Sequence, residues 1–471
     1  MLGPTPPRGG TLSIEAVAAR SPRLSALYER LKAAPIAQRL ARGAFWTVAA
    51  SVVTRFVALG SSIALARLLG KDTFGKLGIV QGTVMMYAAF AGVGAGSTTT
   101  KYVAELRTTD PARAGRILAL AGLTSWGASA IISVLLFVLA PVMAERTLHA
   151  PELTTPLRLA TVLLFFGATN TAQTGALTGL EAFKSLAKAT TITLTLTAAL
   201  TVLGAILGGF EGALLGSVVA VVVTWLVYHV FLRIEARKFN IKITWKDCTR
   251  EWSVLWRFSV PALLAGLVPA PALWASSALL VRQPDGYAEM AVLTVARQWQ
   301  TLILFLPATL ASVLLPVLVN LEGIKDRTTY IKTMKAGVLV TAAVASTAAL
   351  VVSVASVLIM SSYGPSFRSG WASLVLLSFG AVLLAVTTIV GVAITSSGRM
   401  WVGMAINTIW ALAYVGATVA LVRWGAAGIA GANLIAYGIH LFTTAAVVRW
   451  VLFPRMAPSA DAPAPPEETV G

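Results

Sequence analysis

The stretch GAFWTVAASVVTRFVALGSSIALA, residues 43–66, decides the fold of this chain. A helix needs roughly 20 apolar residues to cross a bilayer core, and this run has that length. Arg55 stands at its middle, about 18 Å of helix from either end at 1.5 Å per residue. A charge at that depth costs at least about 2.5–3.5 kcal/mol on insertion scales, and the side chain is too short to reach the headgroups. We therefore expect Arg55 to face a cavity or a partner inside the protein.

Similar apolar runs recur along the rest of the chain. Of its 471 residues, 57% are hydrophobic and 12% are charged, which excludes an ordinary soluble protein. Runs of about 20 residues predict about twelve spans, near 44–66, 77–97, 117–140, 158–179, 189–208, 213–232, 258–281, 287–306, 336–360, 370–394, 400–422 and 426–448. The stretch 287–320 is broken by Pro307 and Pro316, so totals of about eleven to fourteen are compatible with the sequence. The predicted fold class is an all-α polytopic membrane protein.

Basic residues are distributed unevenly between the loops of this topology. With a cytoplasmic N-terminus, most of the 37 Lys and Arg residues fall on cytoplasmic segments. This positive-inside pattern predicts that both termini are cytoplasmic. The net charge of +18 then follows from topology and from contact with anionic membrane lipids, so we predict no nucleic-acid partner.

The most polar loop divides the chain into two halves. We expect, in order, a cytoplasmic tail with an amphipathic interfacial helix at 23–42 (1–43), a six-helix bundle (44–232), a basic linker (233–257), a second six-helix bundle (258–450) and a disordered tail (451–471). Weak matches such as GALLGSVVA (212–220) with AGIAGANLIA (427–436) are compatible with related halves, and coincidence between helices rich in Gly and Ala is the alternative. Two such pseudo-symmetric bundles around a central cavity are typical of transporters.

A second arginine, Arg297, lies in the middle of the span at 287–306. All 19 acidic residues fall in a tail, in a loop or at the end of a span, so neither arginine is expected to have a carboxylate partner. Positive charge without a counter-ion in the membrane favours an anionic passenger, because arginine holds phosphate oxygens in a two-pronged fork. Alternatively, both arginines bond backbone carbonyls at a helix break and serve assembly.

Further polar residues are candidates for the lining of the cavity. Thr294, Arg297, Gln298 and Thr301 recur at i, i+3, i+4 and i+7, which places them on one helix face. Donors and acceptors for sugar hydroxyls are expected from Gln81, Asn170, Gln173, Asn407 and Asn433. Trp274 and Trp299 are candidates for stacking against sugar rings. Amide side chains in membrane helices also tie helices together, so a structural role is the alternative for these residues.

Cofactor chemistry and energy coupling have little support in the sequence. Cys248 is the single cysteine, so no disulfide framework, metal site or cofactor is predicted. Histidine side chains ordinarily titrate near neutral pH, so His440, in the last span, is a candidate for proton coupling. A structural histidine and uncoupled transport are the alternatives.

Several segments carry a family resemblance that covers about residues 44–450. ARLLGKDTFGKLGIVQG (66–82), GVGAGSTTTKYVAELR (92–107), RFSVPALLAGL (257–267), WQTLILFLPATLASVLLPVL (299–318), SSGRMWVGMAINTIW (396–410) and WGAAGIAGANLIAYGI (424–439) resemble Wzx-type polysaccharide flippases. The resemblance implies the fold shared with MATE multidrug exporters and lipid II flippases, in a bacterial inner membrane. It also implies transfer of an undecaprenyl-pyrophosphate-linked oligosaccharide to the outer leaflet by alternating access, for O-antigen, capsule or exopolysaccharide biosynthesis. Polysaccharide polymerase and chain-length machinery are the implied partners.

Three other functions are weighed against this one. MATE exporters of cationic drugs generally need intramembrane carboxylates, which this chain lacks. Lipid II flippases typically have fourteen spans. A membrane-embedded polysaccharide polymerase or ligase usually presents acid, base or nucleophilic groups on the outer surface, where this chain offers only Glu145, His149, Glu152 and scattered charges. We therefore expect a flippase without covalent chemistry.

Overall fold

The computed structural model describes residues 35–92, 94–254, 267–324, 326–396 and 400–452. For residues 35–50, 254, 395, 396, 400, 451 and 452 it describes the backbone alone. The predicted interfacial helix lies outside the described residues up to residue 34, and so does the predicted tail from residue 453 onward. Residues 35–42, the end of that predicted helix, are instead the first turns of a helix that continues without a break to Leu69.

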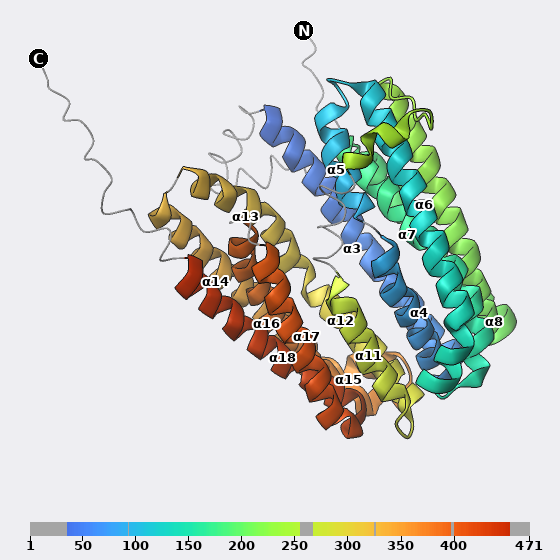
Figure 1. The fold of residues 1–471 in the computed structure, drawn as a ribbon. Helices are drawn as coiled ribbons and strands as arrows, with labels where there is room; N and C mark the ends of the chain where they lie inside the picture. The colour runs from blue at the N-terminus through green and yellow to red at the C-terminus, as the bar shows by residue number, and fades with distance from the viewer. Residues whose placement is uncertain (1–34, 93, 255–266, 325, 397–399, 453–471) are drawn as a thin grey trace, which may run out of the picture.

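Figure 1 shows two groups of long helices lying side by side. The first, which we call the N-terminal group, consists of α3 (Pro35–Leu69), α4 (Lys71–Ala91), α5 (Ala95–Leu106), α6 (Pro111–Val142), α7 (Thr154–Gly179) and α8 (Phe183–Lys238). Short turns join or follow these helices: η1 (Met143–Thr147), η2 (Pro151–Leu153), η3 (Cys248–Glu251) and α9 (Trp252–Val254).

The second group, the C-terminal group, follows the same pattern of long helices joined by short turns. It consists of α11 (Pro269–Val281), α12 (Gly286–Ile303), α13 (Phe305–Gly323), α14 (Arg327–Val354), α15 (Ser356–Ser362), α16 (Trp371–Ser396), α17 (Met400–Leu421) and α18 (Gly425–Val447). Its turns are η5 (Pro365–Gly370), η6 (Val422–Trp424) and η7 (Val448–Leu452).

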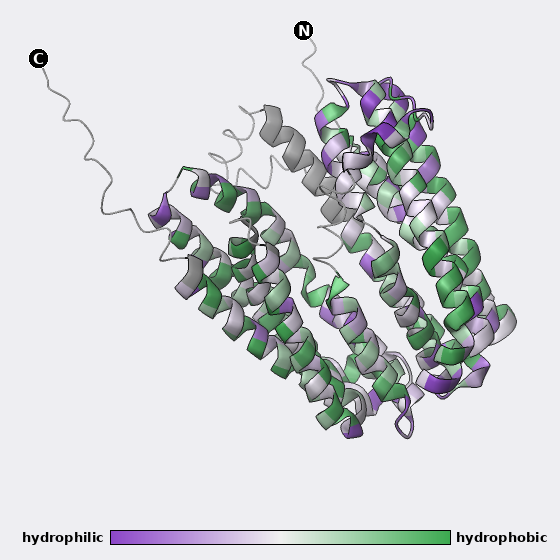
Figure 2. Cartoon of the chain, viewed as in Figure 1, coloured by the Kyte–Doolittle hydropathy of each residue, from purple (hydrophilic) through white to green (hydrophobic). Residues whose placement is uncertain are grey.

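The helices have the length and composition of membrane spans. Among the described residues, 7 helical stretches are long and apolar enough to cross a membrane, and α4 with α5 makes up to 8 as a pair bent by 48°. Two of these stretches, 183–238 and 401–450, each hold two of the spans predicted from the sequence. Large apolar side chains such as Leu207, Val354 and Leu358 are 78%, 80% and 76% exposed, which suits contact with lipid. Figure 2 shows apolar residues along most of the helices. The chain is an all-α polytopic membrane protein.

Helix α8 reverses its direction at a pair of glycines. Gly208 and Gly209 leave helical geometry, and Gly209 has a φ of 57°, which favours a residue without Cβ. The two halves then pack closely, because a Cβ on Gly204 would lie 2.1 Å from the Gly212 carbonyl oxygen. α8 therefore supplies the predicted spans at 189–208 and 213–232 as a tight helical hairpin.

The prediction for the stretch 287–320 is partly wrong. The helix breaks at Leu304, between α12 and α13, and not at Pro307 or Pro316. Pro307 falls in the first turn of α13, where a missing N–H costs little, and Pro316 lies inside the helix. The break positions the backbone carbonyls at the end of α12 for contacts with the N-terminal group.

The two groups meet at the end of the molecule away from the chain termini (Figure 1). There α4 packs directly on α12, because a Cβ on Gly75 would lie 1.8 Å from the Tyr287 carbonyl oxygen. Lys71 Nζ lies 3.7 Å from Glu289 Oε1, and Arg67 Nε donates to the Ser362 carbonyl oxygen at 2.8 Å. We call this region the closed end.

The loop between α6 and α7 strengthens the closed end. Tyr287 Oη donates to the Leu148 carbonyl oxygen at 3.2 Å, and Arg282 Nε donates to His149 Nδ1 at 3.3 Å. Lys76 Nζ pairs with Glu152 Oε1 at 2.8 Å and lies 5.5 Å from the centre of the Tyr287 ring. The hydrogen bond from Lys76 holds the pKa of the Glu152 carboxyl below its ordinary value. Contacts at the closed end thus combine close backbone packing with charged pairs.

Candidate functional site

A cavity of about 480 Å³ lies between α3, α4, α8 and α12, where the two groups face each other. Its wall is rich in hydroxyl and amide side chains, namely Ser61, Ser62, Gln81, Thr190, Thr193, Thr197, Thr201, Ser217, Thr224, Tyr228, Thr294 and Gln298. The apolar part of the wall includes Leu65, Phe74 and Leu77. Such a surface offers many neutral hydrogen-bonding groups with apolar surface between them, a combination that suits a sugar.

The hydroxyl groups come mainly from the hairpin of α8. Thr190, Thr193, Thr197 and Thr201 follow one another at helical spacing, so they share one face of the first half of the hairpin. The second half is tied to that face through two hydroxyl pairs, Thr201–Ser217 at 3.2 Å and Thr190–Tyr228 at 3.1 Å. The close packing of the hairpin therefore sets the position of the wall.

Arg55 lies beside this cavity on α3, one helical turn from the lining residue Ala58. Its Nη1 donates to the Thr301 carbonyl oxygen at 3.1 Å, and the guanidinium lies 4.6 Å from the centre of the Phe305 ring. Both contacts cross from the N-terminal group to the break between α12 and α13. Its Nε is buried without a hydrogen-bond acceptor among the described residues. The geometry thus agrees with the carbonyl-binding alternative for this arginine, and one donor stays unsatisfied.

Arg297 lies within the C-terminal group. Its Nη1 donates to Ser277 Oγ at 2.9 Å, and its Nη2 donates to Tyr414 Oη at 3.2 Å, so the fork bridges α11 and α17. Both acceptors are neutral hydroxyls, and none of the ion pairs between described residues involves Arg297. The guanidinium therefore has no counter-ion among the described residues, and its two hydroxyl partners are not in the cavity wall.

The polar face predicted on α12 divides between two environments. Thr294 and Gln298 line the cavity, and Gln298 Oε1 is buried without a donor among the described residues. Thr301 offers its carbonyl to Arg55 at the next turn, whereas Arg297 turns toward α11 and α17. Gln81 of α4 is exposed and lines the same cavity. The cavity thus receives Gln81, Thr294 and Gln298 from the predicted set, with Arg55 at its edge.

Three of the predicted amides lie outside the wall of this cavity and within one helix group. Gln173 is buried in the N-terminal group, where its amide oxygen accepts a hydrogen bond from Trp225 Nε1 at 3.1 Å. Asn170, on the same helix, has an Oδ1 atom that is buried without a described donor. In the C-terminal group, Asn433 Oδ1 accepts from Gln300 Nε2 at 3.2 Å. These three amides make or border contacts within a helix group, and their substrate-binding role stays a prediction.

Asn407 and His440 share a second cavity of about 450 Å³ inside the C-terminal group. Asn407 Oδ1 and His440 Nε2 lie 3.2 Å apart, and His440 Nδ1 is buried without a described partner. Thr387, Thr388 and Thr444 add hydroxyls to the wall of this cavity. The arrangement holds the imidazole in a polar pocket, and proton coupling by His440 stays a prediction.

The two candidate tryptophans act as packing residues in this structure. Trp274 Nε1 donates to Thr83 Oγ1 at 2.9 Å, which links α11 to α4, and Trp299 Nε1 donates to Tyr363 Oη at 3.2 Å. Neither lines the cavity between the groups. Across the described residues, no cluster of three or more His, Cys, Asp or Glu is placed to hold a metal ion.

Sequence reasoning missed the hydroxyl wall of α8. The signal was present in ATTITLTLTAALT (189–201), where threonine recurs at 190, 193, 197 and 201. Threonine hydroxyls in membrane helices usually bond a carbonyl of the preceding turn, as Thr193 does with Thr190, so they attract little notice as ligands. Only the packing of α8 on α3, opposite α12, shows that these hydroxyls face a cavity.

Comparison with known proteins agrees with this architecture. The family described as polysaccharide biosynthesis protein matches residues 40–322. The EPS I polysaccharide export inner membrane proteins EpsE of Ralstonia nicotianae and Ralstonia solanacearum are 25% identical over 189 residues and 26% identical over 186 residues. These matches cover 40% and 38% of this chain, but only 43% and 42% of the relatives' own length.

Solved structures with the same fold are transporters. The lipid II flippase MurJ in an inward closed conformation has a TM-score of 0.68 at 12% identity, over 86% of this chain and 87% of that chain. An inward-facing multidrug resistance MATE family transporter has a TM-score of 0.67 at 17% identity, over 86% and 94%. A MOP superfamily transporter from Pyrococcus furiosus, noted for a binding pocket of reverse polarity, has a TM-score of 0.64 at 17% identity, over 89% and 95%.

The low sequence identities to the solved structures show that the fold is shared and no more. The family match covers more than half of the chain and therefore shows the family. The fold is that of MATE transporters, as the resemblance implied. The chain belongs to the family of polysaccharide biosynthesis proteins.

Proposed function

We propose that this protein moves an undecaprenyl-pyrophosphate-linked oligosaccharide from the cytoplasmic to the outer leaflet of a bacterial inner membrane. The proposal rests on one juxtaposition: Arg55, without a carboxylate partner among the described residues, lies beside a cavity walled by hydroxyls and amides. Phosphate oxygens are bound most strongly by positively charged donors, and sugar hydroxyls pair well with neutral donors and acceptors. The family match and the export proteins among the relatives support a polysaccharide precursor as the passenger.

The lipid tail would stay in the bilayer between the two groups while the sugar occupies the cavity. The pyrophosphate would then replace the Thr301 carbonyl as the acceptor for Arg55, since a charged acceptor bonds a guanidinium more strongly than a carbonyl does. Arg297 would add positive potential from the C-terminal group, where its fork is held by Ser277 and Tyr414. Alternating access, cytoplasmic termini and coupling through His440 belong to the same proposal.

A drug exporter has weaker support. The cavity between the groups has no carboxylate among its described lining residues, so a cationic drug would find no counter-charge there. The pocket of reverse polarity in the Pyrococcus furiosus neighbour indicates that pocket charge varies within this fold. An enzyme of the same pathway is also less well supported, because Glu152 and His149 are engaged with Lys76 and Arg282 at the closed end.

The test is a deletion strain that accumulates lipid-linked sugar in the cytoplasmic leaflet. Complementation with the wild-type gene is expected to restore surface glycan, and Arg55→Ala is expected to lower it by about tenfold or more, because a charge-assisted hydrogen bond is worth about 1.5–3 kcal/mol. Arg297→Ala is expected to fail as well. Arg297→Lys is expected to restore export only partly, since one ammonium cannot bridge Ser277 and Tyr414 as the planar fork does.

Arg158→Ala serves as the matched control, because Arg158 lies 5.0 Å from the Phe137 ring and outside the cavity. Full restoration of surface glycan by Arg55→Ala, at normal protein levels, would refute the phosphate-binding role. Loss of drug resistance without any change in glycan would favour the exporter instead.

A further inference from the structure

A third pocket, of about 300 Å³, lies inside the N-terminal group and is separate from the cavity between the groups. It is lined by α5, α6, α7, α8 and the loop that follows α8, and its described lining includes no residue of the C-terminal group. In Figure 1, α6 and α8 form the edge of the molecule remote from that group. The pocket is therefore outside the proposed transport path.

The floor of this pocket is aromatic. Trp225 lies at its centre, with ring centroids 5.8 Å from Trp126, 6.0 Å from Phe166 and 5.1 Å from the stacked His229. Its indole N–H donates a hydrogen bond to the amide oxygen of Gln173. With that polar group satisfied by the protein, the floor offers a ligand mostly ring faces and apolar atoms, which suits a hydrocarbon chain.

The guanidinium of Arg233 lies at the rim of the pocket and is held in place by a hydrogen bond. Arg233 is exposed, and its Nε donates to His229 Nε2 at 2.9 Å, so the imidazole acts as an acceptor and fixes the guanidinium. Within the described part of the chain, no carboxylate pairs with Arg233. The terminal nitrogens of this guanidinium are available to an anion at the mouth of the pocket.

The loop after α8 covers one side of the mouth. Trp245 is 56% exposed, and its ring reaches α6 at Gly122, where a Cβ would lie 4.0 Å from it. The loop is held against α6 further along, where a Cβ on Gly115 would lie 2.1 Å from the Lys242 carbonyl oxygen. Trp245 is thus an exposed side chain on a loop whose backbone is packed in place.

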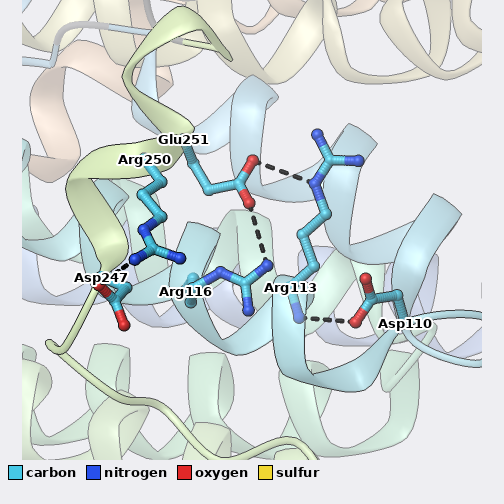
Figure 3. Close-up of polar contacts among 6 residues, drawn as sticks. All are labelled: Asp110, Arg113, Arg116, Asp247, Arg250 and Glu251. Atoms are coloured by element: carbon cyan, nitrogen blue, oxygen red, sulfur yellow. Dashed lines mark hydrogen bonds and ion pairs between the residues drawn. The ribbon is translucent and has the colours of Figure 1, made fainter.

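Figure 3 shows what anchors the far end of this loop. The carboxylate of Glu251, which is only 7% exposed, accepts from Arg113 Nε at 3.0 Å and from Arg116 Nη2 at 3.3 Å. Arg250 pairs with Asp247 at 3.2 Å on the same turn. A buried carboxylate between two arginines of α6 keeps the loop, and with it Trp245, beside the pocket.

We infer that this pocket binds an anionic phospholipid of the leaflet next to the chain termini. Part of an acyl chain would lie on the Trp126–Trp225 floor, and the headgroup phosphate would accept from the terminal nitrogens of Arg233, with Trp245 packed over the glycerol region. The basic residues of the neighbouring loop, Lys242 and Lys246, add potential that favours an anion over a zwitterion. This inference rests on no part of the transport proposal.

Lipid binding to the purified, delipidated full-length protein tests the inference. Native mass spectrometry with phosphatidylglycerol or phosphatidylcholine is expected to show bound phosphatidylglycerol, and thermal unfolding is expected to shift upward with that lipid alone. Arg233→Gln is expected to weaken the binding about tenfold, because it removes one charge-assisted hydrogen bond to the headgroup. The matched control is Arg237→Gln, an exposed arginine one turn further along α8 and outside the pocket, which is expected to bind like the wild type.

Several outcomes would overturn the inference. Equal weakening by Arg233→Gln and Arg237→Gln would indicate a general basic surface. Equal binding of phosphatidylcholine would indicate an apolar pocket without headgroup recognition. Displacement of the lipid by millimolar inorganic phosphate would indicate a free-phosphate site, and tighter binding of a polyprenyl phosphate would assign the pocket to the substrate. Trp245→Ala provides a second variant, expected to lower lipid binding while Arg55→Ala leaves it unchanged.

Discussion

The two ends of the contact between the helix groups are built from different interactions. At the closed end, backbone packs on backbone at Gly75, and charged side chains such as Lys71 and Glu289 bridge the groups. Toward the termini, Arg55 reaches the Thr301 carbonyl and the Phe305 ring. The close contacts at the closed end leave no room for another molecule. The Arg55 guanidinium, in contrast, could exchange the Thr301 carbonyl for a more strongly bound acceptor. Under the proposed function, this difference would hold one end shut while a passenger enters from the other.

Gly75→Ala is expected to have the largest effect on the closed end. The added Cβ would lie 1.8 Å from the Tyr287 carbonyl oxygen, and a backbone atom cannot move aside as a flexible side chain can. We expect the free energy of unfolding to fall by about 1–3 kcal/mol or more, the usual cost of overpacking. We also expect loss of glycan export. Thermal unfolding of the purified protein measures the first effect, and surface glycan measures the second.

Gly82→Ala on the same helix is the control for this prediction, because nothing lies within 4 Å of the added Cβ. It is expected to stabilise the protein by about 0.5–1 kcal/mol through helix propensity. Equal stabilities for the two variants would mean that α4 and α12 do not pack as described.

Glu289→Ala is expected to have the next largest effect. Glu289 Oε2 accepts from the Ala426 backbone N–H at 2.8 Å, at the start of α18, so its loss leaves a helix N-terminus without a cap. We expect a loss of about 1–2 kcal/mol in thermal unfolding experiments. Glu289→Gln keeps an acceptor for Ala426 but removes the charge opposite Lys71, and it is expected to lose less. A larger loss for Gln than for Ala would contradict the capping role.

A double-mutant cycle on Lys76 and Glu152 is expected to give a smaller coupling. Their atoms are 2.8 Å apart, but the side chains are 30% and 55% exposed, and exposed pairs are worth about 0–1 kcal/mol. The variants Lys76→Met, Glu152→Gln and their combination supply the cycle. A coupling above about 2 kcal/mol would show that water is excluded from the pair in the membrane.

The same pair predicts a weak dependence on pH. Because Lys76 holds the pKa of Glu152 below its ordinary value, the bridge contributes fully above that ordinary value and is lost as the pH falls through the lowered one. To follow the closed end, spin labels can be placed at the exposed positions 145, in η1 after α6, and 366, in η5 of the C-terminal group. We expect the distance between these labels to stay constant from neutral pH to below pH 4.5. In Lys76→Met the bridge is absent at every pH, so protonation of Glu152 should no longer change this distance. The idea fails if the wild type opens between pH 5 and 7.

Much of the fold is legible in the sequence because hydrophobic length alone identifies membrane helices. The apolar runs at 189–208 and 213–232, for example, are the two halves of α8, and glycines at 208 and 209 mark the turn between them. The break at Leu304 was assigned to the wrong residues, because proline is tolerated in a first turn and inside a membrane helix whose freed carbonyls find other partners.

The site was less predictable, since the period of a helix does not say which neighbour each face meets. Arg297 and Gln298 are adjacent in the chain, yet one turns to Ser277 and the other to the cavity. Amides such as Gln173 are polar enough to suggest a ligand but are satisfied within one helix group. The hydroxyls of α8 were passed over because each is unremarkable alone. They form a wall only after the hairpin folds.

The placement of Cys248 gives the protein a built-in chemical reporter. It is the single cysteine of the chain, 3% exposed, and it lies in the loop that Glu251 anchors, packed against Ala119 and Leu120 of α6. A thiol reagent can reach this sulfur only when the loop lifts from the helix. The rate of labelling of the unaltered protein therefore measures how often that loop detaches, without an engineered probe.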